Sequence, residues 1–277
     1  MIKVKAPAKI NLGLKIKGKR SDGYHLLDTI YSSINLYDEI KIEKTSAKGI
    51  SIYSNSKNIP LDNTNLIIKA LNAVGINNGL SINLRKRIPV GGGLAGGSTD
   101  AAAILRILPD LGIHLSDREI KEAAINLGAD VYYCFIGNIQ RGKGVGEKLR
   151  QIEVADLPKV ALLPQNISCD TKKVFNKYSQ LKENRFKGDL DLVEKGLIKG
   201  DFSLIDKNID NSLEEAVFLL YPRLKEKVQL LRSHKLNIQI SGSGSSLYMV
   251  LKNEHDIIKL KNVYEEELIV CNMINNR

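Results

Sequence analysis

Apolar and polar positions alternate along residues 8–18, the first segment of the chain with a clear pattern. One face of this segment would carry Ile10, Leu12, Leu14 and Ile16, and the other Lys9, Asn11, Gly13 and Lys15. A period of two is typical of a half-buried strand. Similar patterns predict further strands over residues 26–44, 49–54 and 80–90.

Other segments have the wider spacing of amphipathic helices. Residues 63–75 place apolar residues three and four apart, with Asn63 as the expected N-cap and Gly75 as the residue that ends the helix. Residues 99–108 are rich in alanine and other strong helix formers. We expect Pro109 to end that second helix.

The next helix is marked at both of its ends. Residues 116–128 open with a capping box, formed by Ser116 and Glu119, and close at Gly128. Beyond it we expect two or three charged helices over residues 171–233, two strands within 235–252 joined at a Gly/Ser turn, a helix over 254–267 and a last strand over 268–274.

In this order strands come first and helices are interleaved later, with much antiparallel alternation. The order predicts an α+β fold rather than a doubly wound parallel sheet. The length of 277 residues allows two domains. The succession of expected strands and helices starts again around residues 155–159. We therefore expect an N-terminal domain of residues 1–155 and a C-terminal domain of residues 156–277.

The charge of the chain favours an anionic partner. Its net charge is +10, which suits either nucleic acid or a small phosphorylated molecule. Nucleic-acid binding would call for aromatic residues interleaved with basic ones on one face. Tryptophan is absent and aromatic residues make up only 5% of the chain. We therefore expect no nucleic-acid partner, although a basic nucleic-acid-binding protein stays as a less favoured alternative.

The cysteines and the hydropathy indicate where the protein works. Cys134, Cys169 and Cys271 are far apart and form no CxxC pair, so we expect small core residues in a reducing compartment and no metal site. The N-terminus lacks the apolar region of a signal peptide, and no apolar run approaches the ~18 residues of a membrane-spanning helix. These features predict a cytoplasmic protein with no membrane partner.

Residues 89–102, PVGGGLAGGSTDAA, are the densest glycine stretch of the chain. Gly91, Gly93 and Gly96 fit the spacing G-x-G-x-x-G of dinucleotide-binding folds. However, the preceding strand is not the apolar run of such folds, because it carries Arg85, Lys86 and Arg87. A Walker A loop is excluded, because no Gly-Lys-Ser/Thr follows.

The glycine stretch instead has the properties of another phosphate-binding loop. Glycines allow backbone N–H groups to converge on an anion, and the helix expected to start near Ser98 would point its positive end there. Ser98 and Thr99 add hydroxyl groups. A flexible surface loop is the alternative, but it would not need a helix directly after it.

PVGGGLAGGSTDAA resembles the ATP-binding motif of the GHMP kinases. Residues 6–30, 126–147 and 240–250 resemble three further segments of one member of that family. The stretches P-A-K-I-N and D-G-Y-H are specific to this member and argue against kinases of the homoserine or mevalonate type. The resemblance covers most of the chain.

The resemblance implies a fold and a reaction. The fold is α+β, with an N-terminal domain like ribosomal protein S5 and a C-terminal ferredoxin-like α/β sandwich. The reaction transfers the γ-phosphoryl group of ATP, bound with Mg²⁺, to the 2-hydroxyl of a methylerythritol unit that carries cytidine diphosphate, in non-mevalonate isoprenoid synthesis. The expected partner is this small molecule, and the protein would be a monomer or a homodimer.

The resemblance also assigns site residues. Asp130 would be the catalytic base and Lys9 its cationic partner. The ATP cradle would comprise Pro89, Val90, Gly91, Gly92, Gly93, Leu94, Ala95, Gly96, Gly97, Ser98 and Thr99. Substrate would be bound by Asn11, Tyr24, His25, Thr171, Phe175, Gly242 and Ser243. We expect Mg²⁺ to be held mainly by phosphates and water, with help from Ser98, because no acidic ligand stands out near the loop.

Several of these residues also have plainer interpretations. Asp130 comes just after an expected helix C-terminus, where a negative charge is unfavourable, or it could be an N-cap. Lys9 could be a solvated strand lysine, and Phe175 could be a core residue. His25 could simply bond to nearby backbone, and residues 242–244 could form a hairpin turn.

Two departures from the family pattern lie close to Asp130. The residues that follow it lack the usual proline, and residues 137–141, GNIQR, lack the usual pair of glycines. Both departures concern the local backbone and not the carboxylate.

Overall fold

The structure, a computed structural model, describes residues 1–181 and 186–275. Its strands are β1 (Ile2–Lys19), β2 (His25–Lys44), β3 (Ile50–Ser54), β4 (Leu80–Arg85), β5 (Ile139–Gly144), β6 (Lys148–Gln151), β7 (Lys159–Leu163), β8 (Gln239–Ile240), β9 (Leu247–Leu251) and β10 (Ile269–Ile274). Its helices are α1 (Leu66–Ala73), α2 (Gly96–Arg106), α3 (Asp117–Leu127), α4 (Ala129–Ile136), α5 (Thr171–Tyr178), α6 (Leu190–Lys199), α7 (Phe202–Asn208), α8 (Glu214–Leu220), α9 (Pro222–Ser233) and α10 (Glu254–Lys261), with a 3₁₀ turn at Pro109–Leu111.

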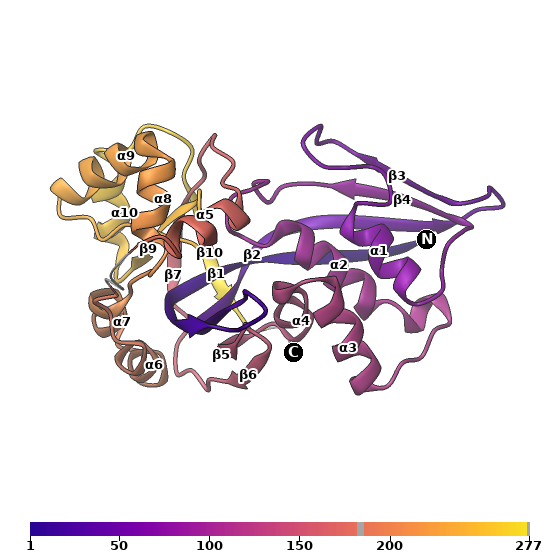
Figure 1. The fold of residues 1–277 in the computed structure, drawn as a ribbon. Coiled ribbons are helices and arrows are strands. Elements are labelled where there is room, and N and C mark those ends of the chain that lie inside the picture. The colour runs from indigo at the N-terminus through magenta and orange to yellow at the C-terminus, as the bar shows by residue number, and fades with distance from the viewer. Residues whose placement is uncertain (182–185, 276–277) are drawn as a thin grey trace. The chain divides into compact units, whose positions relative to one another are not determined.

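The chain divides into two compact units (Figure 1). Unit 1 comprises Met1–Ala8, Leu36–Val90 and Ala95–Gly137, and unit 2 comprises Lys9–Asn35, Gly91–Leu94 and Asn138–Arg277. The long strands β1 and β2 and the glycine stretch contribute residues to both units.

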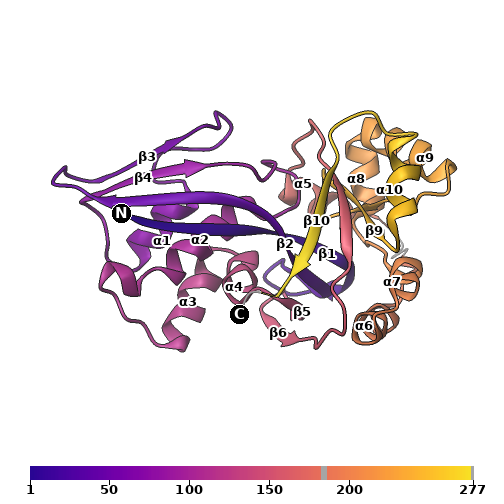
Figure 2. The ribbon, with the colours of Figure 1, turned by 180° about the vertical axis from the view of Figure 1, so that it is seen from behind.

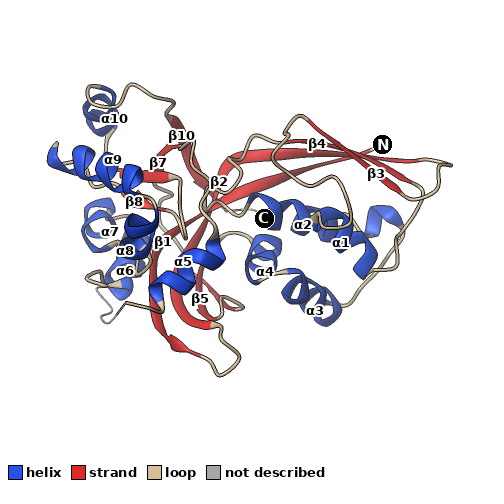
Figure 3. Ribbon diagram, turned by 45° about the horizontal axis from the view of Figure 1, so that its top comes forward, coloured by secondary structure: helices blue, strands red, loops and turns tan. Residues whose placement is uncertain are grey.

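In unit 1, helices pack on one face of a small sheet. The second half of β2 pairs antiparallel with β4, and β3 pairs parallel with β4. Figure 3 shows α1 to α4 together on one side of these strands. The alternation that predicted the strands is the reason for this arrangement, because Ile40, Ile42, Ile82 and Leu84 are all buried.

Two predicted boundaries in unit 1 are wrong for identifiable reasons. The N-cap of α1 is Asn65 and not Asn63, because the Asp62 carboxylate accepts the N–H and hydroxyl of Thr64 and so forms a turn first. The strand predicted over 80–90 ends at Arg85. Beyond that residue the backbone bonds to the side chains of Asn55 and Asp38 instead of a neighbouring strand.

The helix termini of unit 1 follow the sequence more closely. The capping box of Ser116 with Glu119 is present, and Gly128 ends α3 as predicted. Helix α2 begins at Gly96, three residues before the alanine-rich segment from which it was predicted, and it ends before Pro109.

In unit 2, β10, β7, β9 and β8 form an antiparallel sheet, seen from behind in Figure 2. The first half of β2 adds to it through β10 and also pairs with β5, which pairs with β6. A core of apolar side chains joins this sheet to α8, α9 and α10. The Gly/Ser turn between β8 and β9 was predicted correctly.

The interval 171–233 contains more helices than predicted. Its described residues form five helices, α5 to α9, instead of two or three, while residues 182–185 of the interval lie outside the described part. The helices are short because polar N-caps such as Asp170, Asp189 and Asp201 interrupt the segment.

The three cysteines are free and buried, as expected of small core residues. Within residues 1–181 and 186–275, no helix combines the length and apolar character needed to cross a bilayer.

Candidate active site

Lys9 and Asn11 lie on β1 in unit 2, and both are buried. The Lys9 ammonium donates to the Asn11 side-chain oxygen at 2.7 Å and lies 5.6 Å from the centre of the Tyr31 ring. The alternative of a solvated Lys9 is therefore excluded, and the prediction of a half-buried strand is wrong because the polar face of β1 is also largely buried. A buried ammonium needs a nearby acceptor, and the neighbouring asparagine supplies one.

Residues Gly91–Leu94, also part of unit 2, are fixed through their backbone oxygens. These four carbonyls accept hydrogen bonds from Cys169 N, Ser246 N, the Ser241 hydroxyl and Lys9 N respectively. Gly93 has a φ of +73°, and a Cβ placed there would lie 2.1 Å from the Ser241 carbonyl oxygen. Glycine is required at this position, because any side chain would collide with the backbone of Ser241 and Gly244.

The second half of the glycine stretch opens helix α2 in unit 1. Its N-cap is Ala95, with a φ of 57° and no polar side chain to cap the helix. The first N–H groups of a helix have no partner within it, and their aligned dipoles attract an anion. The Thr99 hydroxyl donates to the Pro7 carbonyl at 2.7 Å, whereas Ser98 is half-buried.

A buried cluster of charges lies beneath the start of α2. The Lys86 ammonium bonds to Asp38 and, at 2.7 Å, to Asp100. It also lies close to Gly96, where a Cβ would come within 3.1 Å of the Lys86 nitrogen. The sequence pattern treated Lys86 as part of a charged strand, but its side chain is only 5% exposed.

The carboxyl groups of this cluster outnumber its ammonium group. Burial raises the pKa of Asp100 to about 7 against the opposing effect of Lys86, and the charge of Asp38 adds to the increase. One oxygen of Asp100 is buried and has no hydrogen-bond partner among the described residues.

We expect stability to depend on pH through Asp100. The pKa of Asp100 is higher in the folded state than its ordinary value of 3.8. Its contribution to the free energy of unfolding is therefore complete below pH 3.8 and is lost as the pH rises through about 7. Asp100→Asn removes this loss, so the variant should gain stability relative to the parent between pH 5 and 8. Urea unfolding at several pH values measures the difference, and a constant difference across this range would contradict the prediction.

Asp130 lies in the first turn of α4, in unit 1. The N-cap is Gly128, so Asp130 is not the cap, and its carboxylate lies at the positive end of the helix. Asp130 does follow the C-terminus of α3 as expected, but α4 begins directly afterwards, so the carboxylate also lies at the start of a second helix that was not predicted. The helix forms without the proline that the family pattern places after the aspartate.

The opposite end of α4 is held by α2. The Arg106 guanidinium, in the last turn of α2, donates to the carbonyl oxygens of Cys134 and Phe135. These carbonyls belong to the last turn of α4 and have no helical N–H partner of their own. Nothing in the residues around Arg106 predicted this cap.

His25 and Phe175 come together in unit 2. Their ring centres are 5.1 Å apart, the Tyr178 ring lies 5.9 Å from His25, and the imidazole bonds to the Ser179 hydroxyl at 2.9 Å. Burial, together with the charge of Lys19, lowers the pKa of His25 below its ordinary value. Tyr24 does not join this cluster through a described contact, and its side chain is 60% exposed.

The turn from Gly242 to Ser246 approaches β1 within unit 2. A Cβ on Gly242 would lie 3.2 Å from the Asn11 side-chain oxygen and 3.4 Å from the Lys9 nitrogen. The Ser243 hydroxyl bonds to Thr171 at 2.8 Å, and the Asn211 amide donates to the Gly242 carbonyl at 2.7 Å. The structure thus places Gly242 beside Asn11 and Ser243 beside Thr171.

Tyr178 and Asn211 were not among the residues predicted from the sequence. Tyr178 follows Phe175 by three residues on α5, and this spacing was a usable signal. Asn211 acts through a turn that lies far along the chain, and no local pattern marks it.

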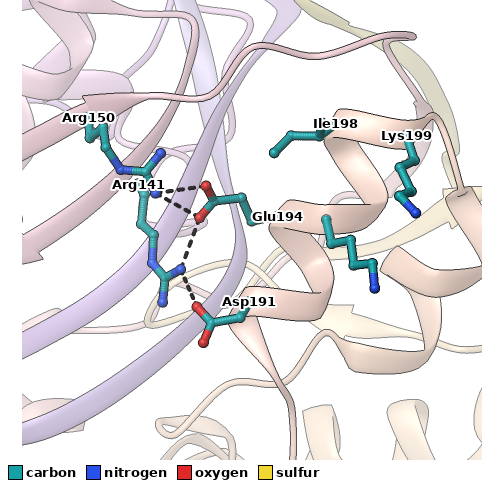
Figure 4. A pocket seen from close by; sticks show the side chains of 7 residues that line it. Arg141, Arg150, Asp191, Glu194, Ile198 and Lys199 are labelled. Atoms are coloured by element: carbon teal, nitrogen blue, oxygen red, sulfur yellow. Dashed lines mark hydrogen bonds and ion pairs between the residues drawn. The ribbon is translucent and has the colours of Figure 1, made fainter.

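Arg141 is the centre of an ion-pair network in unit 2 (Figure 4). Its guanidinium pairs with Asp28 at 2.9 Å and with Glu194 at 2.9 Å, and it also pairs with Asp191. Arg150 bonds to Glu194 from the other side. The network gives a reason for the unusual GNIQR segment, because Arg141 joins β2 and β5 to α6.

Comparison with known proteins identifies the family. Residues 65–138 match the GHMP kinases N terminal domain, and residues 193–269 match the GHMP kinases C terminal domain. The 4-diphosphocytidyl-2-C-methyl-D-erythritol kinase of Caldicellulosiruptor saccharolyticus is 34% identical, over 99% of this chain and 97% of its own. The enzyme of the same name from Thermoanaerobacter pseudethanolicus is 36% identical, over 96% of this chain and 91% of its own.

Solved structures agree with this assignment. A crystal structure of 4-(cytidine 5'-diphospho)-2C-methyl-D-erythritol kinase has a TM-score of 0.79 and 29% identity, and the match covers 99% of this chain and 100% of that one. Homoserine kinase from Cytophaga hutchinsonii, with a TM-score of 0.73, 21% identity and coverage of 98% and 95%, shares the fold. The predicted α+β class is confirmed, and the chain belongs to the GHMP kinase family.

Proposed function

We propose that this protein transfers the γ-phosphoryl group of ATP to the 2-hydroxyl of 4-diphosphocytidyl-2-C-methyl-D-erythritol, in isoprenoid precursor synthesis. The observation that carries the proposal is the similarity, over nearly the full length of each chain, to curated relatives named for this substrate. One homoserine kinase and one mevalonate kinase among the solved structures are 21% and 18% identical to this chain, below the 34% and 36% of the first two curated relatives.

Asp130 and Lys9 are the proposed catalytic residues. Phosphoryl transfer needs a base that accepts the proton of the alcohol and positive charge that stabilises the migrating group. Asp130 lies in the first turn of α4, so its carboxylate is at the positive end of that helix, and a carboxylate oxygen can accept a proton. Lys9 supplies a cation whose position is set by Asn11.

Residues Pro89–Thr99 are the proposed ATP cradle. The N-terminus of α2 offers N–H groups to phosphate, and Gly93 permits an approach that a side chain would block. Ser98 fits a role beside Mg²⁺ better than Thr99, because the Thr99 hydroxyl already donates to Pro7. When bound with ATP, Mg²⁺ would neutralise phosphate charge.

The cluster of His25 from β2 with Phe175 and Tyr178 from α5 suits the cytidine end of the substrate. The chain has no tryptophan, so His25, Phe175 and Tyr178 provide faces on which a pyrimidine can stack. Thr171, Ser243, Gly242 and Asn11 would contact the rest of the substrate, with Tyr24 at the exposed edge.

We also propose four properties of the whole protein. These are the domains of residues 1–155 and 156–277, the cytoplasmic location, the monomeric or homodimeric state and the lack of a nucleic-acid partner.

A coupled ADP-release assay tests the proposal. The purified protein with MgATP is given 4-diphosphocytidyl-2-C-methyl-D-erythritol, homoserine or mevalonate in parallel, with a reaction that lacks an acceptor as background. We expect ADP release with the first acceptor alone. Release with homoserine or mevalonate and none with the cytidine diphosphate compound would overturn the proposal.

A further inference from the structure

Thr29 is a fully buried hydroxyl residue on β2, opposite Gly142 of β5. Its hydroxyl donates to the backbone carbonyl of Gly13 at 2.7 Å. The same oxygen accepts a hydrogen bond from the Asn11 amide nitrogen at 2.9 Å. Thr29 therefore contacts Asn11, and Asn11 in turn contacts Lys9; all three residues belong to unit 2.

This arrangement fixes the direction of every hydrogen bond in the chain of contacts. A hydroxyl group has one hydrogen, and Thr29 uses it on Gly13. Toward Asn11 the Thr29 oxygen can only accept, so the NH₂ end of the amide must face Thr29. The carbonyl oxygen of the amide then faces the Lys9 ammonium, which can only donate.

The opposite orientation of the Asn11 amide is chemically unfavourable. It would place the NH₂ group against the Lys9 ammonium, so that two donors faced each other. It would also place the amide oxygen against a Thr29 hydroxyl whose hydrogen is already used. Asn11 is buried, so water does not readily satisfy the groups left unpaired.

The hydrogen bonds that run from Gly13 through Thr29 and Asn11 to Lys9 form a relay, and the backbone around this relay is also fixed. Gly13 has a φ of +108°, a conformation that favours glycine, and the carbonyl of this residue accepts from Thr29. The buried Tyr248 hydroxyl donates to the Asn11 backbone oxygen at 2.7 Å, which fixes the backbone to which the amide is attached.

We propose that Thr29 is a positioning residue for phosphoryl transfer: by accepting from the Asn11 amide while donating to Gly13, it keeps the Asn11 carbonyl oxygen directed at Lys9. This inference rests on the proposed function, in which Lys9 is the catalytic cation. Thr29 has no direct contact with the reacting groups in this role. It acts through Asn11.

The first test replaces Thr29 by valine, which keeps the shape and removes the hydroxyl. We expect kcat to fall at least tenfold while KM for ATP changes less than twofold, because the relay orients Lys9 and not the ATP cradle. Thr29→Ser, which restores the hydroxyl, should recover kcat to within threefold of the parent. A folded Thr29→Val protein with the kcat of an active parent would overturn the inference.

A second measurement does not require the valine variant to fold. Hydrogen exchange of the Asn11 side-chain NH₂ is followed by NMR in the parent protein, with the signal assigned by its loss in Asn11→Asp. We expect slow exchange, because this NH₂ donates to a buried acceptor, and rapid exchange would contradict the relay. If the parent shows no turnover with the cytidine diphosphate substrate, the proposed function fails, but the exchange result still tests whether the Asn11 NH₂ group is hydrogen-bonded as the structure shows.

Discussion

Replacing Asp130 by asparagine is expected to lower kcat by about 10³-fold, within the range attributed to general acid–base catalysis. The asparagine amide has nearly the same size as the carboxylate but cannot take a proton from the alcohol. ATP binding should remain within about twofold, because Asp130 is not part of the proposed cradle. Stability should change little, because a charge in the first turn of a helix contributes only about 0.3–1 kcal/mol.

Asp117→Asn is the matched control for this substitution. Asp117 is an exposed residue in the first turn of α3, so its change also removes one negative charge from the first turn of a helix. Single-turnover measurements at saturating ATP should show normal chemistry for Asp117→Asn and almost none for Asp130→Asn. If Asp130→Asn kept more than a tenth of the parent rate, Asp130 would not be the base.

Replacing Gly93 by alanine is expected to lower kcat/KM for ATP by at least 10²-fold. The added Cβ would lie 2.1 Å from the Ser241 carbonyl oxygen and 2.8 Å from the Gly244 carbonyl oxygen, and both are backbone atoms that cannot rotate away. The φ of +73° adds strain for any residue with a side chain. Either the loop or the turn must move, and each forms part of the proposed site.

Gly18→Ala provides the comparison for Gly93. A Cβ at Gly18 meets no atom within 4 Å, and this position lies in β1, outside the proposed cradle. Alanine there should leave kcat/KM within about threefold and should not lower Tm. Titration with an ATP analogue, followed by calorimetry, compares the two variants directly. Equal affinities for the analogue would show that close backbone packing at Gly93 is unnecessary for the cradle.

The predictable parts of the fold depend on interactions between residues that are close together in the sequence. The capping box of Ser116 with Glu119 joins residues three apart, so the sequence alone specifies it. Asn63 was the wrong cap because Asp62, its immediate neighbour, forms a competing turn that the helical pattern does not include. Burial of Lys86 could not be predicted, because its partner Asp38 lies 48 residues away.

The same limit applies to the candidate site. The glycine stretch and the segments around Lys9 and Asp130 were found because their residues are adjacent in the sequence and resemble a known family. Thr29 and Arg106 escaped notice because each acts on a residue that only the fold brings near. A buried threonine in a strand has the same local pattern whether or not it orients a neighbouring amide.

The Arg106 cap has a mechanical consequence for unit 1. Helix α2, 11 residues long, has the proposed phosphate-binding end at Gly96 and, at its other end, Arg106, whose guanidinium holds the last turn of α4. At about 1.5 Å per residue α2 is a rigid rod roughly 16 Å long. A displacement of its phosphate-binding end is therefore transmitted to the helix that carries Asp130. The proposed nucleotide cradle and the proposed base are therefore coupled through Arg106, which lies at the opposite end of α2 from Gly96.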